Sequence, residues 1–358
     1  MKARRSMLLV AVLTGMALLM VGCGARDDAA VRDAPAAPDK VYELIGQGIY
    51  GAGNPGLDLQ MMFVKMVEEL SGGRIKMTLH PLGAVVGAFE SFGATSEGVL
   101  DFNMVSPMWH VGHEPAMIYF TSIPATFTHH YQMHSWFYRH GGLGLAREAY
   151  AAHNQYLAGM AIYGNPPQGA EVVHSNVPVR SIDDYRGMTV RSGGAAGKWF
   201  QSLGASVVAL SGEELFSALE RKVVDAVEWV GPTANYPLGL HEAAQYLIMP
   251  GLHTLLMASE VSFNMQVWND LPADLQRIIE VAAMAYGTYK GHAFEDLDKY
   301  YLQKMIDEGV EVIVWEEKEV ERAMQAGKAL WPEFAVNDLS RKVWDSQLKY
   351  MKMIGLVE

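Results

Sequence analysis

The stretch that decides the fold begins with RGMTVRSGG (residues 186–194) and ends with DAVEWVGP (residues 225–232). A helical run follows the first segment, and a short apolar patch from Ala205 to Leu210 lies between the two. We interpret this stretch as strand, helix, strand, helix, strand, the alternation of an open α/β sheet. Such sheets bind ligands at the carboxyl ends of their strands. We therefore expect Arg191, which leaves the first strand, and the pair Glu228-Trp229, which leaves the last, to face one small anionic ligand.

The bulk composition fits a large folded protein with a small-molecule ligand. The chain has 358 residues, of which 50% are hydrophobic, and this is enough for two lobes that each have a core. The formal net charge is -12 and no basic stripe occurs, which argues against a nucleic-acid partner. An anionic ligand remains compatible with this acidity, because one arginine in a dry cleft acts more strongly than screened surface charge.

The N-terminal residues predict export. A basic start precedes an apolar run from Met7 to Val21, which is too short for a comfortable membrane span. The run ends in MVGC (residues 20–23), which resembles a lipobox. We predict a lipoprotein signal peptide at residues 1–23 with lipidation at Cys23, the alternative being a secretory signal cut nearby. Residues 24–40 are predicted to be a flexible tether.

The remaining chain predicts two α/β lobes. A strand at 41–45, a helix at 57–70 and a strand at 75–79 form a βαβ unit, which predicts parallel pairing. We assign 41–164 with 250–310 to lobe 1, and 165–249 with part of 311–358 and the C-terminal helices to lobe 2. The strand starting at Tyr246 is expected to re-enter the first lobe, and a long connecting helix is expected from Asp274 toward Glu308. Repeated crossings predict a ligand cleft that closes by hinge motion.

These segments resemble the substrate-binding proteins of TRAP (tripartite ATP-independent periplasmic) transporters. The resemblance extends from Val41 to the C-terminal helices and is greatest in the branch that binds 2-oxo acids and related monocarboxylates. It is carried by AFESF (residues 88–92), RSGG (191–194), LER (219–221) and the DAVEWVGP segment. The resemblance implies a two-lobed periplasmic-binding-protein-like fold, no catalytic residues, and Arg191 as the group that holds the substrate carboxylate.

The resemblance also implies a cation. In that branch, the positions of Glu228 and Trp229 help to bind Na⁺ or Ca²⁺, which bridges to the acid, and a loop glutamine contacts the same ion. Here Gln168, with Asn165 as a second substrate contact, fits that loop, although Pro166-Pro167 leave the register open. The branch has a further glutamate where this chain has Thr254. Either the site binds no metal, or His253, Thr254 or Glu260 compensates. No organic cofactor is expected.

Aromatic residues are the predicted walls of the site. Phe89 and Trp109 are expected to contact the substrate, with Met108 beside them. The branch has tyrosines where this chain has Met108-Trp109, so hydroxyl donors are lost and a bulkier or more apolar acid is favoured. The alternative for each aromatic side chain is ordinary core packing.

Three histidines have the spacing of metal ligands on a helix: His129, His130 and His134. No carboxylate or cysteine pattern accompanies them, and the chain has no His-Glu-x-x-His motif. We therefore interpret them as a solvated or partly packed helix face.

The favoured function is that of a periplasmic binding protein, tethered by lipid on Cys23, which delivers a small organic acid to a TRAP permease as a monomer or homodimer. Two alternatives remain open. One is an exported enzyme acting on a carboxylic acid, against which stands the lack of a nucleophile elbow, triad-like cluster or phosphate loop. The other is a sensor that presents its closed form to a receptor.

Overall fold

Two mixed sheets organise the chain in the computed structural model, which describes residues 40–121, 123–164 and 169–358. The first sheet has the order β2-β1-β3-β10-β4, and β10 runs antiparallel to both of its neighbours. Its strands are β1 (Tyr42–Gly48), β2 (Ile75–His80), β3 (Phe102–Met104), β4 (Gln155–Tyr163) and β10 (Met257–Asn264). The α/β class predicted from the sequence is confirmed.

The predicted βαβ unit is present at the start of the first sheet. Helix α1 (Pro55–Leu70) joins β1 to β2, which pair in parallel from Tyr42 with Ile75 onward. Asn54 caps the helix by accepting a hydrogen bond from the Gly56 amide at 2.9 Å, and proline follows at the first helical position. Other helices of this part of the chain are η1 (Ala88–Glu90), α2 (Ser91–Glu97), η2 (Pro107–His110), η3 (Pro115–Phe120), α3 (His130–Arg139), α4 (Gly142–Ala151) and α9 (Met265–Asp270).

The second sheet contains the stretch that decides the fold. Its order is β11-β9-β5-β8-β6-β7, with β6 parallel to both β7 and β8. The strands are β5 (Val173–Ser175), β6 (Thr189–Arg191), β7 (Ser206–Val208), β8 (Ala226–Glu228), β9 (Tyr246–Met249) and β11 (Glu311–Val314). The helices that belong with them are η4 (Ile182–Tyr185), α5 (Gly194–Ser202), η5 (Gly212–Glu214), α6 (Leu215–Glu220), α7 (Pro232–Asn235), η6 (Tyr236–Leu238) and α8 (Leu240–Ala243). The predicted alternation of strand and helix is confirmed.

One strand assignment from the sequence is wrong. The strand starting at Tyr246 was expected to re-enter the first lobe, but β9 pairs with β5 and β11 inside the second sheet. The chain crosses to the first sheet only afterwards, between Pro250 and Met257. A buried apolar strand has the same local pattern whichever sheet contains it, so the local sequence carried no information on this choice.

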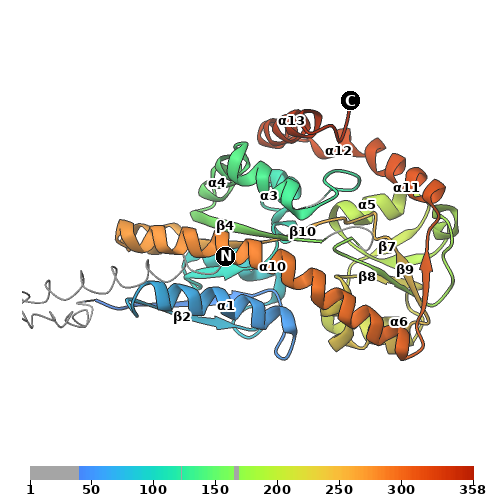
Figure 1. Ribbon diagram of the computed structural model, residues 1–358, viewed down its shortest axis with the longest axis horizontal. Helices are drawn as coiled ribbons and strands as arrows, with labels where there is room; N and C mark the ends of the chain where they lie inside the picture. The colour runs from blue at the N-terminus through green and yellow to red at the C-terminus, as the bar shows by residue number, and fades with distance from the viewer. Residues whose placement is uncertain (1–39, 122, 165–168) are drawn as a thin grey trace, which may run out of the picture. The chain divides into compact units, whose positions relative to one another are not determined.

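The predicted long helix is α10 (Ala273–Asp307), which has 35 residues and packs against elements of both sheets. It packs against β4 and α1 in its first part and against α7 further on. Figure 1 shows α10 beside β4 and α1. At the second contact, Asp298 accepts hydrogen bonds from the backbone amide of Thr233 at 2.9 Å and from its hydroxyl at 2.6 Å. The long helix thus holds the segment that directly follows Trp229.

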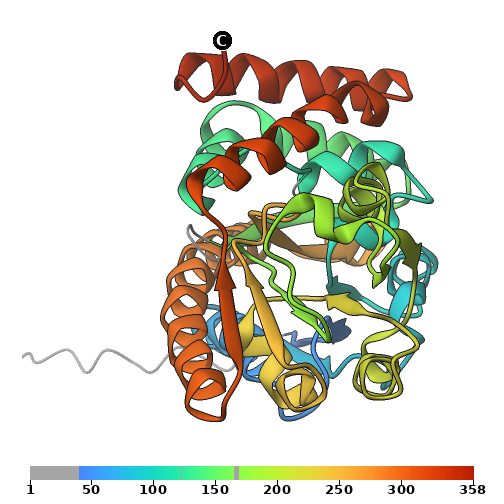
Figure 2. The ribbon, with the colours of Figure 1, turned by 90° about the vertical axis from the view of Figure 1, so that its right-hand side faces the viewer.

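The C-terminal helices also contact both lobes. They are α11 (Glu317–Ala329), α12 (Trp331–Phe334) and α13 (Asp338–Met353), drawn in red in Figure 2. Helix α11 packs against α5, whereas α13 packs against α4 and η3, where Gln347 donates a hydrogen bond to the Tyr119 carbonyl at 2.6 Å. In the described part of the chain, no helix combines the length and the apolar character needed to cross a membrane.

Candidate functional site

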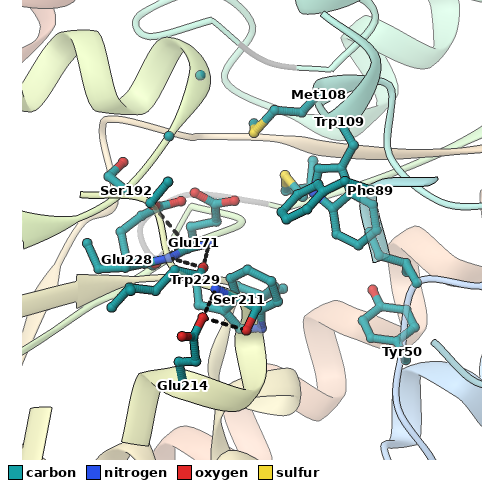
Figure 3. Close-up of a pocket in the computed structure, with 18 of the residues that line it drawn as sticks. Tyr50, Phe89, Met108, Trp109, Glu171, Ser192, Ser211, Glu214, Glu228 and Trp229 are labelled. Carbon is teal, nitrogen blue, oxygen red and sulfur yellow. Dashed lines mark hydrogen bonds and ion pairs between the residues drawn. The ribbon is translucent and has the colours of Figure 1, made fainter. Parts of the chain in front are cut away.

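A cavity of about 480 Å³ lies where the ends of the two sheets approach each other. We call it the acid cavity. Residues of the first sheet and its loops supply an apolar wall, and residues of the second sheet supply the charged groups, as Figure 3 shows. The apolar wall is formed by Ile49, Tyr50, Phe89, Met108, Trp109, Tyr163 and Met257. The polar wall includes Glu171, Arg191, Ser192, Ser211, Glu214, Glu228 and Trp229. This size and asymmetry are typical of a site for a small organic ligand.

Arg191 is the last residue of β6, and the backbone around it holds its side chain in place. Its Nε and Nη2 atoms donate to the Leu210 carbonyl at 3.1 and 2.9 Å, and its Nη1 donates to the Glu228 carbonyl at 2.7 Å. A guanidinium carries five N–H donors, two of them on each terminal nitrogen. Backbone carbonyls therefore hold three of the five N–H groups, and the remaining two are available to a carboxylate.

Glu228 and Trp229 follow β8, the strand next to β6. The Arg191 guanidinium carbon lies 4.5 Å from the centroid of the Trp229 ring, a cation–π contact. The Glu228 carboxylate lies 3.5 Å from Nη1 of the same arginine. A side chain added at Gly212 would come within 3.0 Å of the indole. The sequence prediction that these three residues face one site agrees with their positions in the acid cavity.

The opposite wall is aromatic. Phe89 and Trp109 meet edge to face with ring centroids 5.3 Å apart. Met108 reaches across the cavity to Gly194, where an added Cβ would lie 3.2 Å from its Cγ. All three of these predicted wall residues line the acid cavity. The glycine at 194 also has a φ of +55°, a conformation that other residues adopt only with strain.

Two tyrosines complete this wall and were not predicted. The hydroxyls of Tyr50 and Tyr163 lie 3.3 Å apart. Behind them, the buried Lys290 of α10 donates to the Ser259 hydroxyl at 2.7 Å, and its Nζ lies 4.5 Å from the centroid of the Tyr163 ring. Burial lowers the pKa of Lys290 to about 7. The acid cavity thus has two tyrosines in its lining, one from β4 and one from the loop after β1, although positions 108 and 109 have none.

Glu171 is the main site residue that the sequence analysis missed. It is 1% exposed and lies beside Glu228 and His253, with the potential ligand atoms of the three within 4.8 Å of one another. We call these three residues the cavity cluster, and Figure 3 shows its two glutamates on the side of the cavity opposite Phe89 and Trp109. Burial, and then the neighbouring Glu228, raise the pKa of Glu171 well above its usual range. Its signal in the sequence was a single carboxylate in the otherwise apolar run from Ala170 to Val173.

The cavity cluster has the properties of a cation site. In the part of the chain that the structure describes, Glu171 Oε2, Glu228 Oε2, His253 Nε2 and the Thr254 hydroxyl are buried and make no hydrogen bond of normal length. Glu171 Oε2 lies 3.6 Å from His253 Nε2, and Glu228 Oε2 lies 3.5 Å from Arg191 Nη1. Buried polar atoms are normally paired, so this group of unsatisfied oxygen and nitrogen atoms calls for a ligand. Burial lowers the pKa of His253 to about 4, which leaves a neutral imidazole. These residues fit a bound metal ion, with carboxylate oxygens as the main donors.

The remaining predicted site residues have different outcomes. Thr254 is fully buried, and its carbonyl accepts a hydrogen bond from the amide of Ala170, next to Glu171. Glu260, one proposed substitute for the missing glutamate, lies elsewhere: it bonds His110 at 2.6 Å and the Tyr150 hydroxyl. Gln168, Asn165 and Cys23 lie outside the described residues.

Comparisons with known proteins agree with this geometry. Residues 51–338 match the protein family called bacterial extracellular solute-binding protein, family 7. The chain is 27% identical over 295 residues to a monocarboxylate 2-oxoacid-binding periplasmic protein of Nostoc sp., covering 81% of this chain and 79% of that protein.

Two solved structures of TRAP periplasmic solute-binding proteins are similar at 25% identity. The protein of Colwellia psychrerythraea, with bound calcium and pyruvate, has a TM-score of 0.79, and the match covers 88% of this chain and 96% of that one. The protein of Pseudoalteromonas atlantica, with bound sodium and pyruvate, has a TM-score of 0.78, with coverage of 88% and 95%.

Proposed function

The chain belongs to the bacterial extracellular solute-binding proteins of family 7, and on this premise we propose that it captures a small organic acid in the periplasm and delivers it to a TRAP permease. The acid cavity between the two sheets takes the ligand, and closure of the lobes buries it. The protein acts by binding and release, without a catalytic step. Lipidation of Cys23, ahead of a tether at 24–40, keeps it at the membrane.

The observation that carries the proposal is the fixed Arg191 guanidinium. Because backbone carbonyls take three of its N–H groups, its orientation is set before any ligand arrives. A preorganised fork loses little conformational freedom on binding a carboxylate, which favours affinity. The indole of Trp229 lies against the same guanidinium in a cation–π contact.

We infer that a divalent cation, Ca²⁺ in preference to Na⁺, binds with the acid. If the buried pair Glu171 and Glu228 are both ionised when a carboxylate ligand is present, these three groups carry three negative charges against the single positive charge of Arg191. One divalent ion neutralises the difference, and buried charge without compensation is costly. Glu171 thus supplies the carboxylate ligand that the family resemblance led us to expect at the position of Thr254. Ca²⁺ also prefers oxygen ligands, which the two carboxylates supply. Gln168 and Asn165 are proposed to add amide contacts from the preceding loop.

The apolar wall indicates the kind of acid. Phe89, Met108 and Trp109 present ring and thioether surface, and the carboxylate-binding groups lie on the other side. We therefore propose a monocarboxylate or 2-oxo acid with an apolar side chain longer than the methyl group of pyruvate. Apolar contact with that chain, worth about 0.8 kcal/mol per buried CH₂, sets the preference.

The test is a thermal unfolding screen against monocarboxylates, 2-oxo acids and dicarboxylates, each with added Ca²⁺ or with chelator. A true ligand at a hundred- to thousand-fold excess over Kd should stabilise the protein by about 3–4 kcal/mol. We expect the largest shift for a 2-oxo acid with a branched or aromatic side chain, and a smaller shift with chelator. Turnover of the stabilising acid would instead indicate an enzyme. Stabilisation by no acid would contradict the proposal.

A further inference from the structure

A second group of potential metal ligands lies outside the acid cavity. His130, His292 and Glu295 have ligand atoms within 4.8 Å of one another. We call them the helix cluster, because His130 begins α3 while the other two belong to α10. His130 is one of the three histidines whose spacing suggested metal ligation in the sequence. The carboxylate that this pattern lacked is supplied by a helix more than 150 residues further along the chain.

The position of His130 is fixed by close packing. The residue is 8% exposed, and its ring lies on Gly291 of α10. A Cβ at position 291 would come within 2.9 Å of His130 Nδ1 and 3.0 Å of the Ile162 carbonyl oxygen. A glycine is therefore required for this approach, and it brings the imidazole directly beside His292, with ring centroids 5.3 Å apart and planes at 90°.

His292 and Glu295 share one face of α10, because residues three positions apart are neighbours on a helix surface. His292 is exposed, so a metal ion could reach the cluster from solvent. One turn further on, Lys299 donates to Glu295 Oε1 at 3.0 Å. This ammonium group would compete with a metal ion for the carboxylate.

The surroundings of two of the three groups favour the protonation state that ligation needs. Burial, and then the neighbouring His292, lower the pKa of His130, which favours neutral imidazole. The hydrogen bond from Lys299 lowers the pKa of Glu295, which favours the carboxylate. Metal ligation requires neutral imidazole and ionised carboxylate.

We propose that His130, His292 and Glu295 form a binding site for a divalent transition-metal ion of the Zn²⁺ class, separate from the acid cavity. Two imidazoles and one carboxylate are a known ligand set for Zn²⁺, with water in the fourth position. Imidazole donors favour Zn²⁺, Cu²⁺ and Ni²⁺ over Ca²⁺ and Mg²⁺. An ion here would join the start of α3 to the middle of α10.

The experiment is a Zn²⁺ titration by calorimetry on the exported protein, purified without a polyhistidine tag. The Glu171→Gln background weakens any Zn²⁺ bound in the acid cavity. In that background we expect one Zn²⁺ per chain, and an affinity at least about tenfold lower after His292→Ala. His292 is exposed, so this variant should fold, and its far-UV circular dichroism should match that of its parent. Co²⁺ should give the visible absorption of a four-coordinate site, and this signal should disappear in the same variant.

Two further variants serve as matched controls. His129→Ala changes the neighbouring histidine, which lies outside the cluster, and should leave Zn²⁺ affinity unchanged. Lys299→Ala removes the competing ammonium group and should raise affinity several-fold. Equal Zn²⁺ binding before and after His292→Ala would overturn the proposal, and so would an equal loss in His129→Ala.

Discussion

The cavity cluster and the helix cluster differ in the two properties that decide which ion a protein site takes. The cavity cluster has two carboxylates and one histidine, all 3% exposed or less, whereas the helix cluster has two histidines and one carboxylate and is open to solvent at His292. Oxygen donors in a dry site next to an arginine favour a hard cation that acts together with an anionic ligand. Nitrogen donors at a surface favour a transition metal that acts on its own.

Metal binding at the two clusters should have different effects, one on acid affinity and the other on stability. An ion in the cavity cluster would contribute directly to the charge seen by the acid, so its affinity and that of the acid should be coupled. An ion in the helix cluster contacts only α3 and α10, so it should change stability and leave acid affinity unchanged.

Arg191→Ala should cause the largest loss. It removes the carboxylate partner and leaves Glu171 and Glu228 without a compensating charge, so acid binding should weaken by about 2–5 kcal/mol. Arg191→Lys keeps the charge but not the fork and should recover only part of this loss. Calorimetry with the best acid from the screen measures both effects. Unchanged acid affinity in Arg191→Ala would rule out the carboxylate-clamp proposal. Unchanged Zn²⁺ affinity, measured in the Glu171→Gln background, is the control.

Glu171→Gln should lower Ca²⁺ affinity by about tenfold to hundredfold, because it removes one charged oxygen ligand. Burial raises the pKa of Glu171, so at any pH below that pKa Ca²⁺ must displace a proton to bind. Ca²⁺ affinity should therefore increase with pH, and the variant should lose most of that dependence. Titrations at several pH values measure this slope. An unchanged slope in Glu171→Gln would assign the proton to another group.

Trp109→Ala should reduce affinity for an acid with a long apolar side chain by about 1–3 kcal/mol, and should affect pyruvate much less. The indole lies on the wall opposite the cavity cluster, so Ca²⁺ affinity in the absence of acid should not change. Competition experiments with acids of increasing chain length give the comparison. Equal losses for all acids would indicate that Trp109 supports the fold and does not read the side chain.

The smallest expected effect is on stability as a function of pH. The raised pKa of Glu171 means that the folded protein binds this proton more tightly than the unfolded chain does. The resulting stabilisation is fully present below the usual glutamate pKa of 4.5 and is lost as pH rises through the folded pKa. Ca²⁺ replaces the proton, so its stabilising effect should increase over the same range.

Thermal unfolding is measured at each pH with Ca²⁺ and with chelator, and the difference between the two gives the stabilisation by Ca²⁺. Groups that the ion does not contact contribute equally to both measurements, so their contributions cancel. Asp298 is the main group to be removed in this way, since burial raises its pKa to about 6. A Ca²⁺ effect that is constant with pH would show that Glu171 is not the group displaced.

The parts of the site that were predictable from the sequence lie at the ends of neighbouring strands. Arg191 and Glu228 could be paired because a strand–helix–strand–helix–strand pattern brings successive strand ends to one edge of a sheet. The long α10 was equally predictable, because its apolar pattern is local. Trp229 was predicted together with Glu228 from the same strand end, and Phe89 was predicted as a wall residue of the cavity that it lines.

What could not be predicted depends on contacts between distant segments. Glu171 was not predicted, because nothing local distinguishes a carboxylate that lies in a cavity from one at a strand end. The sheet membership of β9 required knowledge of its partners β5 and β11. The helix cluster was dismissed because Glu295 is remote from His130 in the chain, although a glycine at 291 brings them together.

Four side chains described above belong to helix α10, so the winding of this helix sets the direction in which each of them points. Lys290 behind the tyrosine pair, His292 and Glu295 of the helix cluster, and Asp298 below the Trp229 segment lie within about 12 Å along its axis. A single residue inserted between Gly291 and Glu295 would turn everything beyond it by about 100°. Such an insertion would leave both sheets intact. It would nevertheless move Glu295 away from His130 and turn Asp298 away from Thr233. The length of this helix can therefore change only by insertions or deletions that keep these side chains pointing in the same directions.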